Sequence, residues 1–149
     1  MNALQNSPVL EIRKLKNNFG AEIAGVDLAT ATDDELASVV AAFHLNGAIL
    51  LRNQTMDADA LVRFVSQFGE PEQHTLKEYT MPTHPLVYRL SNRILDGKPI
   101  GIHNDGVGWH TDYSYKQEPV MSTMLYAVEV PPDDPDDRPD VDHEGHQKR

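Results

Sequence analysis

The stretch IHNDGVGWHTD, residues 102–112, contains the pattern His-x-Asp twice. His103 and Asp105 form the first pair, and His110 and Asp112 form the second. An imidazole and a carboxylate two residues apart can hold a metal ion, so the local structure decides which pair is a candidate site. The chain has seven histidines in 149 residues, and roughly 0.7 such matches are expected by chance. The neighbouring sequence must therefore separate a site from a coincidence.

The two pairs differ in the local structure that their neighbours predict. An Asp-Gly turn dipeptide follows His103, so the first pair is interpreted as a loop histidine beside a turn-capping aspartate. WHTDYSY (109–115) alternates as a strand does, which places His110 and Asp112 on one face and holds both rigidly. With a second histidine, this pair makes the facial triad of non-haem Fe(II) oxygenases. An ordinary polar pair at a strand end is an equal alternative on these residues alone.

The rest of the chain predicts a mixture of strands and helices. Thr32 and Glu35 form the capping box of a first helix, which Gly47 ends. A second helix follows Thr55 and ends at Gly69. Strands are predicted over 9–15, 21–28, 48–54, 86–92, 109–115 and 120–130, and loops over 70–85 and 93–108.

Composition narrows the class of protein. The formal net charge of −10 disfavours nucleic acid and anionic membranes as partners, because both bind clustered Lys and Arg. No stretch approaches the ~20 apolar residues of a membrane span, and the first residues do not predict a secretory signal. The absence of cysteine excludes disulfides, thiolate zinc sites and a Cys nucleophile. We expect a cytoplasmic protein.

Three segments are predicted. Residues 1–8 read as a flexible polar arm, and 9–132 as the folded part. Residues 133–149, DDPDDRPDVDHEGHQKR, are acidic and almost without apolar residues. Such a segment buries too little apolar area to offset its ordering entropy, so we predict a disordered acidic tail.

Several motifs together resemble the TauD/TfdA family of Fe(II)- and 2-oxoglutarate-dependent dioxygenases. WHTDYSY, the Glu-Pro that follows it and LYAVEVPP (125–132) look like the family core. Upstream motifs follow in the family's order: GAEIAGVDL (20–28), GAILLRNQ (47–54), FVSQFGEPEQH (64–74) and RLSNRILDGKPIG (89–101). The resemblance covers residues 9–132. It implies an α+β, mainly β fold: an incomplete double-stranded β-helix (jelly roll) with N-terminal helices.

The resemblance also implies a site and its partners. His110 and Asp112 would be two of three iron ligands, with Fe(II) as cofactor and 2-oxoglutarate as cosubstrate. O2 and a small organic acid, taurine-like or aryloxy-acid-like, would be the other reactants. His74 falls where taurine-type members place a substrate-contacting histidine, although an exposed loop histidine is an equal interpretation. Asn92 and Tyr79 would line the same pocket.

The resemblance breaks after residue 132. Family members continue with a GGDT motif, whose threonine contacts 2-oxoglutarate, and then with the distal iron histidine and a 2-oxoglutarate-binding arginine. No residue of 133–149 matches these, so we expect a truncated or frame-shifted member with little activity of its own. Alternatives are a non-catalytic fragment that binds a partner through an unclosed sheet edge, and a small metal-binding protein that uses tail histidines. Exposed strand faces would favour aggregation or a homo-oligomer.

Overall fold

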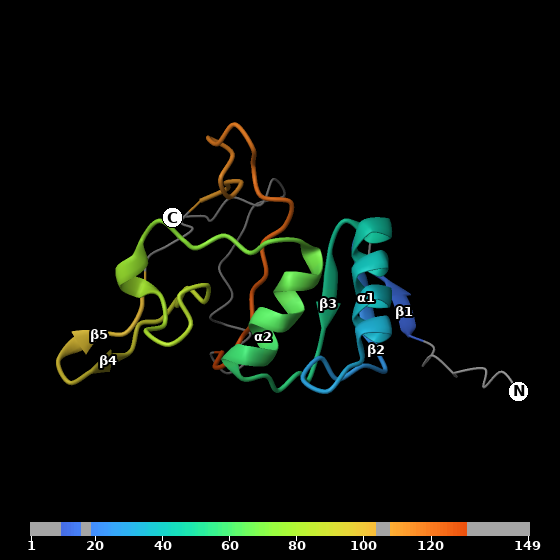
Figure 1. The fold of residues 1–149 in the computed structure, drawn as a ribbon, viewed down its shortest axis with the longest axis horizontal. Coiled ribbons are helices and arrows are strands. Elements are labelled where there is room, and N and C mark those ends of the chain that lie inside the picture. Colours follow the sequence, from blue (N-terminus) through green and yellow to red (C-terminus); the bar gives the residue numbers. More distant parts are fainter. Residues whose placement is uncertain (1–9, 16–18, 104–107, 131–149) are drawn as a thin grey trace, which may run out of the picture. The chain divides into compact units, whose positions relative to one another are not determined.

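The computed structural model describes residues 10–15, 19–103 and 108–130. The predicted arm 1–8 and tail 133–149 lie outside the described residues. The chain forms two compact units, Met1–Ile102 and His103–Arg149, and each is treated by itself. The named helices and strands belong to the first unit (Figure 1): β1 (Glu11–Lys14), β2 (Ala21–Ala24), α1 (Asp33–Asn46), β3 (Ile49–Leu51), α2 (Ala58–Val65), η2 (Ser66–Phe68), η3 (Lys77–Tyr79), β4 (Ile94–Leu95) and β5 (Lys98–Pro99).

A three-stranded sheet with the order β1-β2-β3 organises the first unit. Strand β2 pairs antiparallel with β1 and parallel with β3. Helix α1 connects the two parallel strands and lies along one face of the sheet (Figure 1). On that face Ala21 and Ile23 of β2 pack with Ala42 of α1 and form the centre of a buried apolar cluster. The three strands predicted here are confirmed, although each is shorter than its predicted range.

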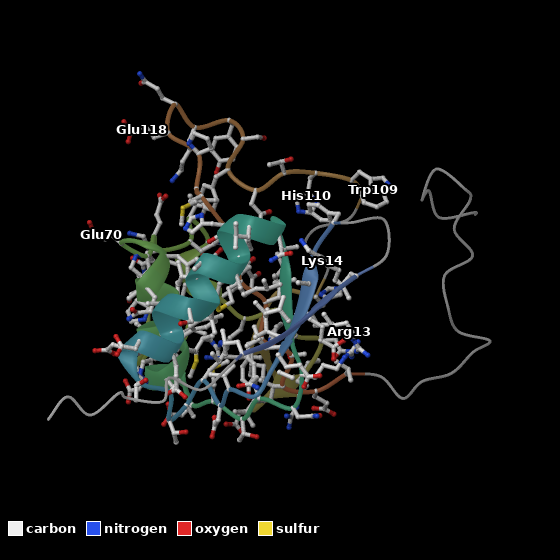
Figure 2. All side chains as sticks on the ribbon, turned by 90° about the vertical axis from the view of Figure 1, so that its right-hand side faces the viewer. Arg13, Lys14, Glu70, Trp109, His110 and Glu118 are labelled. Carbon is white, nitrogen blue, oxygen red and sulfur yellow. The ribbon has the colours of Figure 1, made fainter. Side chains whose placement is uncertain are left out.

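The opposite face of the sheet is charged. Glu22 on β2 lies between Arg13 on β1, 2.7 Å away, and Arg52, 3.4 Å away. The hydrogen bond from Arg13 lowers the pKa of the Glu22 carboxyl below its usual value. The side chains of Arg13 and its neighbour Lys14 are labelled on β1 in Figure 2. Alternation along β2 therefore places Ala21 and Ile23 in the core and Glu22 among the charged side chains of the other face.

Both ends of α1 follow the local sequence. The Thr32 hydroxyl accepts a hydrogen bond from the Glu35 N–H, and the Glu35 carboxylate accepts from the Thr32 N–H at 2.6 Å. That backbone bond, with a second bond from the Thr32 hydroxyl, lowers the pKa of Glu35. Gly47 has a φ of 72°, and its N–H donates to the Phe43 carbonyl. A Cβ at Gly47 would lie 3.0 Å from the Phe19 ring. The predicted capping box and glycine stop are confirmed.

Helix α2 begins later than predicted. Asp57, not Thr55, is the N-cap, and its carboxylate accepts a hydrogen bond from the Ala60 N–H at 2.8 Å. The α-helix ends at Val65 and continues as the short 3₁₀ turn η2 before Gly69. Phe64 is 2% exposed and makes an edge-to-face contact with Phe68. Helix α2 therefore contributes Phe64 to the core.

The region before the His-x-Asp pairs differs from its prediction. The predicted strand 86–92 makes only isolated bridges, at Tyr88 and Leu90. The predicted loop that follows contains the hairpin β4–β5, whose turn residues Asp96 and Gly97 both have positive φ, as two-residue hairpin turns require. A Cβ on Gly101 would lie 2.5 Å from the Arg89 carbonyl oxygen, so glycine permits this close backbone approach.

The two strands predicted in the second unit are wrong. Residues 112–115 form a turn, in which Tyr113 has a φ of 53° and accepts a hydrogen bond from the Lys116 N–H. Residues 120–127 do alternate between half-buried and exposed side chains, as an extended chain does. A strand also needs a neighbour to complete its backbone hydrogen bonds, and within 108–130 no strand is formed.

Within the part of the chain that the structure describes, no helix combines the length and apolar character needed to cross a bilayer.

Candidate metal centre

The side chains of His110 and Asp112 meet in the second unit. Nε2 of His110 lies 3.2 Å from Oδ1 of Asp112. Two ligands that bind one ion at right angles, each with a bond of about 2.1 Å, lie about 3.0 Å apart. The observed separation of these two atoms therefore matches neighbouring positions on a single metal ion. Both side chains are partly exposed, at 51% and 39%, so an ion can reach them from solvent.

The other ring nitrogen of His110 fixes its orientation. Nδ1 lies 2.9 Å from the carbonyl oxygen of Gly108. A carbonyl only accepts, so Nδ1 carries the proton and donates it to this contact. In the neutral ring Nε2 then presents its lone pair towards Asp112. This second-sphere contact is the arrangement that metal-binding histidines use.

The other carboxylate oxygen of Asp112 is also held. The Thr123 hydroxyl donates a hydrogen bond to Oδ2 at 2.7 Å. Oδ1 thus faces His110 while Oδ2 is engaged elsewhere. Two electron-rich atoms, Nε2 and Oδ1, therefore face each other at 3.2 Å, an arrangement that a proton or a cation between them stabilises.

A turn, not a strand, brings these residues together. His110 lies outside regular secondary structure, and the chain turns from Asp112 onwards, with Tyr113 in the left-handed region. The ammonium of Lys116 lies 4.3 Å from the centre of the Tyr113 ring, a cation–π contact within the turn. Trp109, beside His110 in Figure 2, is 78% exposed and does not shield the pair.

The donor set fits two positions of an iron site. Imidazole nitrogen and carboxylate oxygen are the ligands of Fe(II) oxygenase triads. Among residues 10–15, 19–103 and 108–130, no group of three or more His, Cys, Asp or Glu side chains is placed to hold a metal. Within its described residues the structure therefore brings together two candidate metal ligands, His110 and Asp112, a pair that we call the half-site. His103 lies exposed in a bend, and its pattern partner Asp105 falls outside the described residues.

The predicted substrate-contacting residues lie in the first unit. The His74 ring stacks on Tyr88 with ring centres 3.9 Å apart, and Tyr79 meets Tyr88 edge-on at 6.5 Å. The Leu76 N–H donates to Nδ1 of His74 at 3.1 Å, so Nε2 is the ring nitrogen that carries the proton in the neutral ring. Asn92 is exposed, and no described contact joins it to this aromatic cluster.

Three contributors were missed from the sequence. Gly108 acts through its carbonyl, which sequence patterns do not reveal. Tyr88 links His74 and Tyr79, and only its place in an apolar stretch could have drawn attention to it. Thr123 stood in a segment interpreted as a strand, where a polar side chain on an alternating run was a usable signal.

Comparison with known proteins identifies the family. Residues 11–138 match the taurine catabolism dioxygenase TauD, TfdA family. The chain therefore belongs to this family, as its motifs indicated.

Individual relatives agree with this assignment. Pentalenolactone F synthase of Streptomyces avermitilis is 30% identical over 132 residues, which are 85% of this chain and 43% of the relative. The alpha-ketoglutarate-dependent sulfonate dioxygenase of Saccharomyces cerevisiae is 28% identical over 137 residues, 87% of this chain and 32% of the relative. A crystal structure of a taurine dioxygenase from Burkholderia xenovorans is similar with a TM-score of 0.58 and 31% identity, over 75% of this chain and 38% of that one. The chain spans less than half the length of these relatives.

Proposed function

We propose that this chain forms the first part of an Fe(II)- and 2-oxoglutarate-dependent dioxygenase domain in which His110 and Asp112 bind the iron. The observation that carries the proposal is the 3.2 Å separation of Nε2 and Oδ1, with the outer atom of each side chain held by Gly108 or Thr123. Membership of the family supports the chemistry. The jelly roll of that domain is part of the same proposal.

The chain's own residues would hold the iron in position and select the substrate. With iron and 2-oxoglutarate bound, O2 would be the oxidant: one of its oxygen atoms would enter succinate as 2-oxoglutarate loses CO2, and the other would hydroxylate a C–H bond of the substrate. His110 contributes a neutral nitrogen and Asp112 one negative charge. We propose a small organic acid, a sulfonate or an aryloxy acid, as the substrate. His74 is proposed to contact the anionic group of this substrate, and Tyr79 and Asn92 are proposed to contact the same molecule.

We expect weak but specific metal binding through the second His-x-Asp pair. In an electron paramagnetic resonance titration with Mn(II), His110→Ala should lower the affinity by at least about 10-fold, because it removes one ligand of the half-site. His103→Ala is the matched control and should leave the affinity unchanged. Equal losses in the two variants, or a loss only in His103→Ala, would show that the pair is assigned wrongly.

Turnover by the chain alone should be low. Two ligands hold iron loosely, and we propose that residues outside the described part, or outside this chain, complete the site. Turnover is measured as the formation of succinate from 2-oxoglutarate in the presence of Fe(II), with the proteins used for the Mn(II) titration. Rapid succinate formation by the unmodified chain would contradict it.

A second candidate function is that of an interaction module. Leu125, Val128 and Val130 are 79%, 86% and 68% exposed in a segment that forms no strand within 108–130. Apolar side chains that are exposed close together favour association with another chain.

This surface predicts self-association. Light scattering of the purified chain should show dimers or larger species, and replacing Leu125 and Val128 together by serine should shift the population towards monomer. The same double change at Leu90 and Ile94, which are also exposed, is the control for a general loss of apolar surface. An unmodified chain that is monomeric at all concentrations would rule out the interaction module as a function.

A further inference from the structure

Thr123 makes a contact that no motif of the sequence predicted. Its hydroxyl donates to Oδ2 of Asp112 at 2.7 Å, eleven residues back along the chain. Both residues belong to the second unit. The distance is that of a strong hydrogen bond to an ionised acceptor, a class about twice as strong as neutral bonds.

This contact restricts how Asp112 can meet an ion. A carboxylate can bind a metal through one oxygen or through both, and it can rotate between these modes. With Oδ2 engaged by the hydroxyl, Oδ1 is the oxygen directed at Nε2 of His110, 3.2 Å away. The carboxylate plane is thus set before an ion arrives, which reduces the ordering that binding would otherwise require.

We propose that Thr123 is a positioning residue for the metal half-site, holding Asp112 in a one-oxygen binding mode. The inference rests on the proposed metal binding by His110 and Asp112. Thr123 itself touches only the outer oxygen of the ligand. Its counterpart on the other side is the Gly108 carbonyl, which orients His110 in the same manner.

A purely structural role is the competing explanation. The same bond ties the extended segment 120–127 to the turn at Asp112, so its loss could simply loosen the second unit. The two explanations predict different ligand geometries for the bound ion. A positioning role changes the ligand geometry of the bound ion, whereas a tether changes only the order of the surrounding chain.

The test uses the full chain and Mn(II) as the probe. Thr123→Val removes the hydroxyl while nearly conserving shape, and we expect the Mn(II) affinity to fall by about 10-fold to 100-fold, the usual range for a second-sphere contact. Thr123→Ser keeps the hydroxyl and should restore the affinity to that of the unmodified chain. Ser122→Ala, which removes a hydroxyl from the adjacent residue, is the matched control and should bind normally.

A spectroscopic signature separates positioning from tethering. Co(II) in place of Mn(II) gives a visible absorption spectrum that depends on ligand geometry. At saturating Co(II), Thr123→Val should show an altered spectrum, because Asp112 is then able to bind through both oxygens, and Thr123→Ser should show the original one. An unchanged spectrum in Thr123→Val, with only a weaker affinity, would overturn the positioning role.

Two further outcomes keep this inference distinct from the proposed function. If the unmodified chain binds Mn(II), Asp112→Ala abolishes binding and Thr123→Val binds normally, the metal site stands and the role of Thr123 is wrong. If the unmodified chain binds no Mn(II), the proposed function of the half-site fails and the inference fails with it.

Discussion

A chain in which Asp112 is replaced by asparagine should bind Mn(II) at least about 100-fold more weakly than the unmodified chain. Asparagine keeps the shape of the side chain and a carbonyl oxygen that can accept the Thr123 hydroxyl. It removes the negative charge that faces the ion. At an effective dielectric constant near 20, two unit charges 4 Å apart attract by about 4 kcal/mol, and a divalent ion in direct contact gains more. A loss of about 2.8 kcal/mol already corresponds to 100-fold.

The control for this substitution is Glu118→Gln. Glu118 is an exposed acid of the same unit, labelled in Figure 2, so its change removes one charge without touching the half-site. Its Mn(II) affinity should stay close to that of the unmodified chain. If both variants lose affinity alike, the acidic chain attracts Mn(II) through its overall charge, and Asp112 is not a specific ligand of the ion.

Replacing Phe64 by alanine should lower the free energy of unfolding of the first unit by about 3–5 kcal/mol. This is the range for removing a buried aromatic ring, which forfeits its burial and leaves a cavity. Phe64 is 2% exposed and contacts Phe68 edge-on, and Phe68 contacts Phe43 of α1 in the same way. The substitution therefore removes one end of the aromatic chain that joins α2 and η2 to α1.

Urea denaturation followed by helical circular dichroism measures this effect. The helices named here lie in the first unit, so their signal reports on that unit. Leu45→Ala is the control, because Leu45 lies on α1 and is 80% exposed; its effect should stay within about 0.5 kcal/mol. A loss below about 1 kcal/mol for Phe64→Ala would mean that the ring does not support the core.

The parts of the fold that the sequence predicted are those whose causes lie within a few residues. The Thr32 and Glu35 capping box and the Gly47 stop each need only a short stretch of chain, and both were found. The start of α2 was placed two residues early, because Thr55 and Asp57 are both suitable caps. Only the structure shows that the Asp57 carboxylate is the one that accepts from the helix.

The errors arise where a partner far along the chain decides the structure. The exposure of the side chains alternates over 120–127, but a strand is defined by hydrogen bonds to a neighbour that the pattern cannot supply. In WHTDYSY the left-handed conformation of Tyr113 breaks the alternation, and such a conformation is unusual for a tyrosine.

The candidate site was accessible to sequence reasoning only in part. The spacing alone offered two His-x-Asp pairs, and the resemblance of WHTDYSY and its surroundings to the family core singled out His110 and Asp112. The atoms that orient these two side chains could not be predicted, because one is the backbone carbonyl of Gly108 and the other is the hydroxyl of Thr123, eleven residues after Asp112. The stacking of His74 on Tyr88 likewise depends on how a long irregular segment folds back.

The arrangement of β2, α1 and β3 also has a kinetic consequence. These three elements occupy one uninterrupted stretch, Ala21–Leu51, and the parallel pairing of β2 with β3 closes a connection that α1 itself fills. Because these contacts all form within one stretch, they require less loop-closure entropy than contacts that span the whole chain. We therefore expect this stretch to nucleate the first unit during synthesis on the ribosome, before His110 and Asp112 have left the exit tunnel.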